Sequence, residues 1–450
     1  MYVHAGCRYL YLRSDYTTFV LYKQNMTFEE LNLTKPLLNA VTDAGYTTPT
    51  TIQAKAFSVI MSGKDVLGIA QTGTGKTVAY LLPSLKHWKY DKSKLPQILI
   101  LVPTRELVLQ VEAEAKKLAK YTNASVVGVF GGVNMKPQAA LIKEGADVLI
   151  ATPGRLLDLA LNGALSLKNI KRLVIDEFDE MLNLGFRAQL TSVLAMMRPK
   201  RQNILFSATM TDEVDAVLND FFDFPEEVSL AASGTPLENI TQITYAVPNF
   251  NTKMNFLQHL LLKDTNMTKV LIFASGKKIA DEIHERLQLQ FDHELAVIHG
   301  NKNQNTRFNT VEDFDAGKCR ILVATDLMAR GLDVSEVTHV INIDVPPVAE
   351  NYMHRIGRTG RAGKKGIAIT FVSDADKENK IAVETLMGRK IAMKKMPDEI
   401  EISDVLIPEE VPVVNMKIIE VRRPKQVAKG KSHHEKKDKN KKVNIKVSRE

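Results

Sequence analysis

The stretch Ala70-Gln-Thr-Gly-Thr-Gly-Lys-Thr77 decides the fold of this chain. It follows the strand-like run Asp65–Ile69 and opens the helix-forming run Val78–Leu85, which is the context that a phosphate-binding loop requires. Its glycines let the backbone turn tightly, so that successive amide groups point at phosphate oxygens. Lys76 would neutralise the phosphate charge, and the Thr77 hydroxyl can bind Mg²⁺. The alternative is an ordinary glycine-rich turn.

On both sides of this loop, short β-branched runs alternate with segments of helical period. Few tight hairpin signals separate the runs, which favours parallel strands joined by helical crossovers and hence an α/β fold. The expected strands are 65–70, 97–102, 125–130, 147–151, 173–176 and 203–207, then 243–247, 269–274, 295–298, 320–324, 339–343 and 367–371. The organisation expected from them is an N-terminal extension at 1–25, α/β domains at 26–230 and 240–395, a flexible linker at 231–239, and a C-terminal extension at 396–450.

The charge of the chain is concentrated at its end. The 450 residues include 60 basic and 52 acidic side chains, and the last thirty residues hold 12 and 3 of these. The remaining body therefore carries 48 basic and 49 acidic residues, so a nucleic-acid partner of the body must be argued from motifs. The basic tail is expected to be disordered by itself and to attract polyanions, or else only to keep the chain soluble.

Other features of composition exclude several classes of protein. Cys7 and Cys319 are too few and too isolated for a disulfide framework or a zinc site, which fits a reducing compartment. No run of apolar residues is long enough for a membrane span. We therefore expect a cytoplasmic protein without a membrane partner.

A second acidic motif, Asp176-Glu177-Phe178-Asp179, ends the apolar run Leu173–Ile175. Carboxylates at the end of a buried strand are where a phosphate-loop enzyme places its metal and water groups. Asp176 would hold Mg²⁺, and Glu177 would orient and deprotonate the attacking water. The alternative is a solvated acidic turn that precedes a helix.

These two motifs and several further short motifs follow one another along the chain in an order that is known from one protein family. The order is Phe28, Gly45–Gln53, Ala70–Thr77, Pro103–Leu107, Gly131-Gly132, Thr152–Arg155, Asp176–Asp179, Ser207–Thr209, Leu271–Phe273, His299-Gly300, Gln304-x-x-Arg307, Ala324–Asp333 and His354–Arg361. Over about residues 26–375 the chain resembles the DEAD-box ATP-dependent RNA helicases, of a bacterial type. The resemblance implies two tandem RecA-like domains with parallel sheets, and a disordered basic C-terminal tail.

The resemblance also implies roles for individual residues toward ATP and Mg²⁺. Phe28 would stack on adenine and Gln53 would read its edge, while Asp333 would meet the ribose. Lys76, Asp176, Glu177, Arg358 and Arg361 would be the catalytic set, the two arginines reaching the γ-phosphate from the second domain. Asp179, Ser207, Thr209 and His354 would couple the motifs to the nucleotide state. Thr77 and Asp176 would hold the metal. The loop residues in contact with the nucleotide would be Gln71, Thr72, Gly73, Thr74, Gly75, Lys76 and Thr77.

RNA contact is implied at a set of small residues, hydroxyls and arginines. Such a set suits the sugar-phosphate backbone rather than base edges, and so indicates sequence-independent binding of single strands or short duplexes. The set is Thr104, Arg105, Gly132, Thr152, Gly154, Arg155, Gly300, Arg307 and Thr325.

The chain departs from the family pattern at Phe178, where the motif that names the family has Ala. We expect ATPase chemistry to survive this change, so the step that it would affect is the coupling between RNA binding and hydrolysis. Met328 is likewise bulkier than the alanine often found at its position. The expected function is RNA-dependent ATP hydrolysis that unwinds or remodels duplexes, within ribosome assembly or RNA decay. The alternatives are an ATP-gated RNA clamp with little unwinding and a DNA helicase of a related branch.

Overall fold

The structure is a computed structural model that describes residues 26–70, 73–229, 239–329, 334, 336–360 and 364–411. The expected N-terminal extension, nearly all of the expected linker and the basic tail lie outside the described residues. The same is true of Gln71, Thr72, Asp333 and Arg361.

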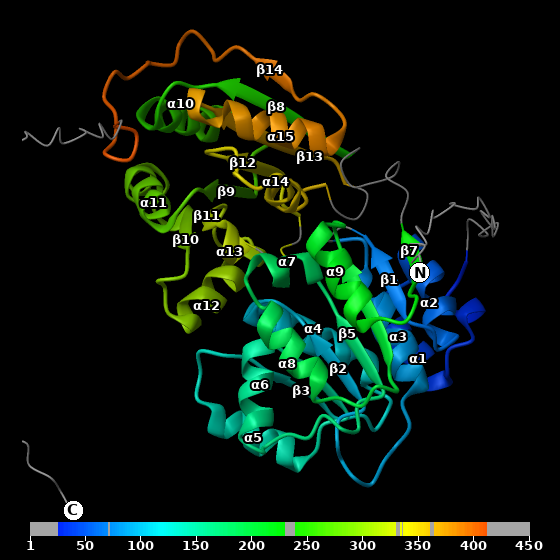
Figure 1. Cartoon of the computed structure of the whole chain (residues 1–450). Coiled ribbons are helices and arrows are strands. Elements are labelled where there is room, and N and C mark those ends of the chain that lie inside the picture. Colours follow the sequence, from blue (N-terminus) through cyan, green and yellow to red (C-terminus); the bar gives the residue numbers. More distant parts are fainter. Residues whose placement is uncertain are drawn as a thin grey trace, which may run out of the picture. The chain divides into compact units, whose positions relative to one another are not determined.

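The first half of the chain forms one parallel sheet with the strand order β3-β4-β2-β5-β6-β1-β7 (Figure 1). Its strands are β1 (Val66–Ile69), β2 (Ile98–Leu101), β3 (Val126–Val129), β4 (Val148–Ala151), β5 (Arg172–Ile175), β6 (Gln202–Ser207) and β7 (Glu226–Ser229). Its helices are η1 (Glu29–Leu31), α1 (Lys35–Asp43), α2 (Thr51–Met61), α3 (Lys76–His87), α4 (Arg105–Ala119), α5 (Met135–Glu144), α6 (Pro153–Leu161), α7 (Phe178–Asn183), α8 (Arg187–Ala195) and α9 (Asp212–Phe221).

The second half forms a parallel sheet with the order β10-β11-β9-β12-β13-β8-β14. Its strands are β8 (Ile240–Ala246), β9 (Val270–Ala274), β10 (Leu295–Ile298), β11 (Ile321–Thr325), β12 (His339–Asn342), β13 (Gly366–Val372) and β14 (Ala392–Lys394). Its helices are α10 (Phe250–Lys263), α11 (Lys277–Phe291), η3 (Asp292–Glu294), α12 (Gln304–Asp315), α13 (Asp326–Ala329), α14 (Ala349–Ile356), η4 (Asp374–Asp376) and α15 (Lys377–Met387). If the strands of each sheet are numbered from 1 along the chain, both sheets have the order 3-4-2-5-6-1-7. The same α/β architecture therefore occurs twice.

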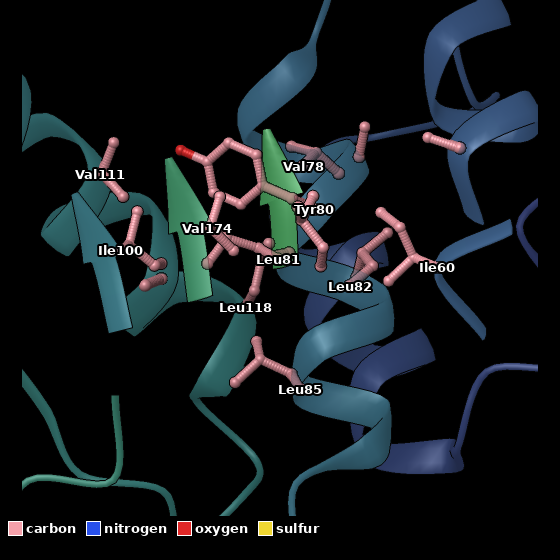
Figure 2. Packing of buried hydrophobic residues seen from close by; sticks show 14 of the residues in the cluster. Ile60, Val78, Tyr80, Leu81, Leu82, Leu85, Ile100, Val111, Leu118 and Val174 are labelled. Carbon is pink, nitrogen blue, oxygen red and sulfur yellow. The ribbon is translucent and has the colours of Figure 1, made fainter. Parts of the chain in front are cut away.

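Both faces of the first sheet are buried, as the near-continuous apolar strands require. In β2, Ile98 and Ile100 belong to the cluster under α1–α4, while Leu99 and Leu101 belong to the cluster under α6–α9. Figure 2 shows the first of these clusters, where side chains of α3 such as Leu82 pack between helices and strands. The two-domain α/β fold expected from the sequence is confirmed.

All twelve expected strands are present, with bounds that shift by three residues or fewer. Two further strands, β7 and β14, were not expected. Their side chains are mostly exposed, because both strands lie at an edge of their sheet, and so they lack the apolar run that marks the inner strands. At the start of the described chain, the amide of Thr27 donates to Glu30 Oε2 beside the three-residue helix η1.

The segment that follows β14 folds back along α10. Three asparagine side chains, two in α10 and one just before it, donate hydrogen bonds to backbone carbonyls of this segment. The bonds run from Asn255 to Glu401 at 2.9 Å, from Asn251 to Val405 at 2.6 Å and from Asn249 to Ser403 at 2.5 Å. Ile400 and Ile407 pack against the core of the second sheet. The first part of the expected C-terminal extension therefore belongs to this second α/β unit. In the part of the chain that the structure describes, every helix is too short or too polar to cross a membrane.

Candidate nucleotide and nucleic-acid site

The order of the first sheet divides its motifs into two groups. The loop Ala70–Thr77 follows β1, Asp176 follows β5 and Thr209 follows β6, and these three strands are neighbours. The motifs that begin at Thr104 and Thr152 follow β2 and β4, on the other half of the same edge. Since all strands are parallel, every one of these loops lies at the carboxyl edge, where open α/β sheets bind ligands. The expected nucleotide residues and RNA residues thus occupy adjacent halves of one edge.

The phosphate-binding loop has the backbone that its sequence predicts. Gly73 and Gly75 have φ values of 82° and 93°, a region that favours glycine, and α3 begins directly afterwards at Lys76. The Lys76 ammonium is buried and has no hydrogen-bond partner among the described residues, although Asp176 Oδ1 lies 3.6 Å away. A buried ammonium group that has no hydrogen-bond partner and lies at the N-terminus of a helix is suited to bind phosphate oxygens.

Gln53 is fastened to this loop. Its Oε1 accepts from the amide of Thr50 at 2.9 Å, and its Nε2 donates to the carbonyl of Gly75 at 3.2 Å. Thr50, which sequence analysis did not single out, also donates its hydroxyl to the carbonyl of Thr74 at 2.9 Å. A Cβ on Gly75 would come within 2.5 Å of Gln53 Nε2. The amide expected to read adenine therefore also fixes the position of the phosphate-binding loop, and one donor and one acceptor site remain on it.

Phe28 lies deeper than its expected role requires. Its side chain is 2% exposed and belongs to the hydrophobic core, with the Tyr46 ring centroid 6.5 Å away. In this arrangement the face of the ring is covered by protein. Stacking on a base would require the covering side chains to move, a requirement that the sequence does not reveal.

The carboxylate of Asp176 is held from two sides. Its Oδ1 accepts from the amide of Glu177 at 2.9 Å, and its Oδ2 accepts from the Tyr80 hydroxyl at 3.1 Å. Tyr80 projects from α3 and is fully buried (Figure 2). Burial and the charge of Asp176 raise the pKa of Tyr80 well above its ordinary value, so the hydroxyl keeps its proton. Sequence analysis missed Tyr80, because a tyrosine inside an apolar helix carries no signal of a polar contact 96 residues away.

Glu177 follows in an unusual conformation, with φ 51° and ψ 51° at the start of α7. Burial raises the pKa of its carboxyl group, an effect that the nearby positive charges of Lys76 and Arg358 oppose. The next residue, Phe178, is completely buried in the cluster under α6–α9. The ring that replaces the family's methyl group is thus housed in the core, away from the carboxylates.

The four residues expected to couple the motifs are brought together. Asp179 Oδ2 accepts from both the amide and the hydroxyl of Thr209, at 3.0 and 2.9 Å, and the Ser207 hydroxyl donates to the carbonyl of Thr209 at 2.7 Å. His354 Nε2, from α14, lies 4.0 Å from the same oxygen of Asp179. The Arg358 guanidinium is buried, and its Nε donates to the carbonyl of His354 at 3.2 Å. The second sheet thus supplies a histidine and an arginine to the nucleotide half of the first.

The residues of the first domain that are expected to bind RNA differ in whether their groups are buried, already hydrogen-bonded or open. Gly132 has φ 79°, and a Cβ there would overlap the Arg105 guanidinium, so these two residues are in close contact. Thr104 uses its hydroxyl to accept from the amide of Leu107 at the start of α4. Thr152 precedes α6 and is buried, whereas Gly154 has open space where a side chain would be.

Arg155 points inward. It donates to Gln138 Oε1 at 2.6 Å and to the carbonyl of Val133 at 2.8 Å, and its side chain is 7% exposed. The guanidinium therefore supports the loop after β3. Its expected contact with RNA stays a prediction.

Two expected RNA arginines take part in a contact between the sheets. Arg105 donates to Gln304 Oε1 at 3.1 Å, Gln304 Nε2 donates to Glu106 Oε1 at 3.1 Å, and Arg307 forms a largely buried ion pair with Glu106. In the second sheet, Gly300 follows β10 and Thr325 ends β11, so both lie at the same carboxyl edge. Glu106 was missed, because its partner is about 200 residues away and its motif gives it no separate role.

Two protein families match the chain, one in each of its two α/β halves. Residues 50–217 match the family described as DEAD/DEAH box helicase, and residues 252–363 match the helicase conserved C-terminal domain. The chain is 39% identical over 371 residues to the ATP-dependent RNA helicase dbp2 of Aspergillus clavatus, covering 81% of this chain and 67% of that protein. It is 39% identical over 379 residues to the DEAD-box ATP-dependent RNA helicase 24 of Oryza sativa subsp. japonica, covering 83% of this chain and 49% of that protein.

The fold is similar to that of solved relatives. A structure of S. cerevisiae Dbp5 bound to RNA and ADP BeF3 matches with a TM-score of 0.73 and 29% identity, covering 82% of this chain and 95% of that one. The chain spans about two thirds of the Aspergillus protein and about half of the rice protein. Both of these relatives are eukaryotic, so they do not support the bacterial type expected from the sequence.

Proposed function

The chain belongs to the DEAD/DEAH box helicases, and from this premise we propose how its residues act as an RNA-dependent ATPase and ATP-dependent RNA helicase. The observation that carries the proposal is the buried Lys76 ammonium beside Asp176, with Arg358 of the second domain close enough that its charge opposes the rise in the pKa of Glu177 caused by burial. The catalytic centre is therefore made of residues from both α/β domains. ATP hydrolysis is therefore coupled to closure of the two domains.

The first part of the mechanism is phosphate binding. Lys76 takes the β- and γ-phosphate oxygens, and the amides of the tight loop take others. Gln53 holds the loop through the Gly75 carbonyl and offers its remaining donor and acceptor to adenine. Gln71, Thr72 and Asp333 complete the nucleotide contacts in this proposal, from outside the described residues.

The residues present also fit a magnesium ion. Mg²⁺ binds proteins through few oxygen ligands and keeps several waters, and the Thr77 hydroxyl and the Asp176 carboxylate are such a pair. Among the described residues no group of three or more acidic, histidine or cysteine side chains is gathered for a metal, which agrees with a site completed by phosphates and water. When bound, the ion supplies neutralisation of charge on the phosphates.

Hydrolysis itself falls to Glu177 and the arginines. Glu177 orients the attacking water and accepts its proton, and burial, which raises its pKa, makes it a stronger base than an exposed glutamate. Arg358, joined by Arg361, stabilises the charge that develops on the γ-phosphate. Asp179, Thr209 and His354 transmit the state of this centre between the sheets.

RNA binds at the other half of the carboxyl edges, in this proposal through Thr104, Arg105, Gly132, Thr152, Gly154 and Arg155 with Gly300, Arg307 and Thr325. The contacts go to the sugar-phosphate backbone and so do not depend on sequence. Because Arg105 and Arg307 bind Gln304 and Glu106 in this structure, an RNA phosphate would exchange with or add to these partners.

Further parts of the proposal come from the sequence. We assign residues 26–230 to the first domain and residues 240–395, together with the packed segment up to Ile407, to the second, with 231–239 as linker. We regard the protein as cytoplasmic. Ribosome assembly or RNA decay are the proposed settings. The basic tail would tether RNA by charge, so a chain that ends at Glu420 should bind RNA more weakly and with a shallower salt dependence, while its RNA-free ATPase rate is unchanged.

The test combines two assays on the full chain. ATPase stimulation is compared for RNA and DNA of one sequence, and displacement of a short RNA duplex is compared for the native chain and Glu177→Gln. RNA-specific stimulation, together with loss of displacement in Glu177→Gln, supports the proposal. Displacement that persists without turnover would favour an ATP-gated clamp, and equal stimulation by DNA would contradict RNA specificity.

A further inference from the structure

The hydroxyl of Tyr80 contacts Asp176, one of the two residues assigned to Mg²⁺. Tyr80 is one helical turn after Thr77 on α3 and is fully buried. Its hydroxyl donates to Asp176 Oδ2 at 3.1 Å. Figure 2 shows the ring reaching from α3 toward the strand of Val174, with its oxygen at the edge of the apolar side chains.

The direction of this hydrogen bond follows from its chemistry. A carboxylate accepts hydrogen bonds, so the single proton of the Tyr80 hydroxyl points to Asp176. The other lone pairs of the carboxylate stay available to a cation.

Packing holds the Tyr80 ring in place. The ring lies 5.7 Å from that of Phe206 on β6, centroid to centroid. Phe206 in turn covers Gly68 of β1 so closely that a Cβ on Gly68 would overlap the Phe206 ring. Glycine on one strand thus makes room for an aromatic layer on which the tyrosine rests, and the hydroxyl has little freedom to move.

We propose that Tyr80 is a positioning residue that holds the Asp176 carboxylate in the orientation required by Mg²⁺–ATP. This role rests on the proposed function and concerns the same site. Groups that orient metal ligands through hydrogen bonds contribute to metal affinity although they do not touch the metal. Asp176 Oδ1 is already held by the amide of Glu177, so Tyr80 fixes the second oxygen of the carboxylate. Tyr80→Phe would keep the packing of the ring and release this oxygen.

The experiment compares Tyr80→Phe with the native chain and with Tyr352→Phe. Tyr352 is a matched control, because it is equally buried and its hydroxyl donates to Gln242 at 3.2 Å in the second sheet, away from the metal residues. Binding of a fluorescent ATP analogue is measured in EDTA and during titration with Mg²⁺, and thermal unfolding of each protein is recorded.

For Tyr80→Phe we expect the Mg²⁺ concentration at half-saturation to rise roughly tenfold or more. Its nucleotide affinity in EDTA should equal that of the native chain, and Tyr352→Phe should match the native chain in both conditions. An unchanged Mg²⁺ requirement in Tyr80→Phe would overturn the inference, as would an equal loss of affinity with and without Mg²⁺. A native chain that binds no nucleotide would instead overturn the proposed function.

Discussion

Replacing Phe178 with alanine restores the residue that the family motif usually has, yet the structure predicts a large loss of stability. The ring is completely buried, in a cluster that also contains Met181 and Leu205. Removing a buried phenylalanine side chain costs about 3–5 kcal/mol of unfolding free energy, and more where the surroundings cannot collapse. Here the backbone on either side is pinned, because the amides of Glu177 and Glu180 donate to neighbouring aspartates. We therefore expect the upper part of that range.

The assay is thermal unfolding followed by tryptophan fluorescence. Trp88, the only tryptophan, follows α3 and so reports on the first sheet. For a domain of this size, 1 kcal/mol shifts Tm by about 2–4 °C, so a loss of about 4–5 kcal/mol in Phe178→Ala should lower Tm by roughly 8–20 °C. Phe224→Ala is the control. Phe224 is 92% exposed, and its loss should change stability by no more than about 0.5 kcal/mol.

Below its Tm, the alanine variant should still hydrolyse ATP. The carboxylates of Asp176 and Asp179 are held by backbone amides and by Tyr80 and Thr209, none of which depends on the Phe178 ring. A loss of stability below about 1 kcal/mol would refute the argument from packing. A folded Phe178→Ala variant without ATPase activity would refute the separation of the ring from the chemistry.

Three further predictions concern other contacts. Gln53→Ala removes two hydrogen bonds that fasten the phosphate-binding loop, each worth about 1 kcal/mol, so the KM for ATP should rise roughly 5- to 30-fold in steady-state assays. Glu106→Gln weakens a charged contact with Arg307 worth about 1.5–3 kcal/mol, so RNA-stimulated ATPase should fall about tenfold or more while the RNA-free rate is unchanged. Burial lowers the pKa of His339 below its ordinary value of about 6.5, so the unfolded chain binds the proton more readily. The stability that the neutral ring contributes is present above that pH and is lost as the pH falls through the lowered pKa. Tm should therefore fall on acidification, and less so in His339→Gln. An unchanged KM in Gln53→Ala, unchanged stimulation in Glu106→Gln, or equal acid sensitivity of His339→Gln would contradict the respective prediction.

Much of the site could be predicted because its parts are local. The conformation of Gly73–Thr77 is determined by its own glycines and by the helix that follows, and Asp176 ends a strand that its own apolar residues define. Tyr80 and Glu106 could not be predicted, because their partners are distant in sequence and their residue types have ordinary uses on a helix. The burial of Phe28 and the inward turn of Arg155 are also results of packing, which no short motif encodes.

The sequence by itself determined the two α/β halves, the phosphate-binding loop, the carboxylates that follow β5 and the family to which the chain belongs. These features depend on short-range chemistry: glycine conformations, apolar strand runs and the spacing of motifs. Only the tertiary structure decided the order of the strands, which places the nucleotide residues at the ends of β5, β6 and β1 and the expected RNA residues at the ends of β3, β4 and β2. It also decided that Tyr80 holds the Asp176 carboxylate, since contacts between distant segments form only when the sheet and its helices pack together.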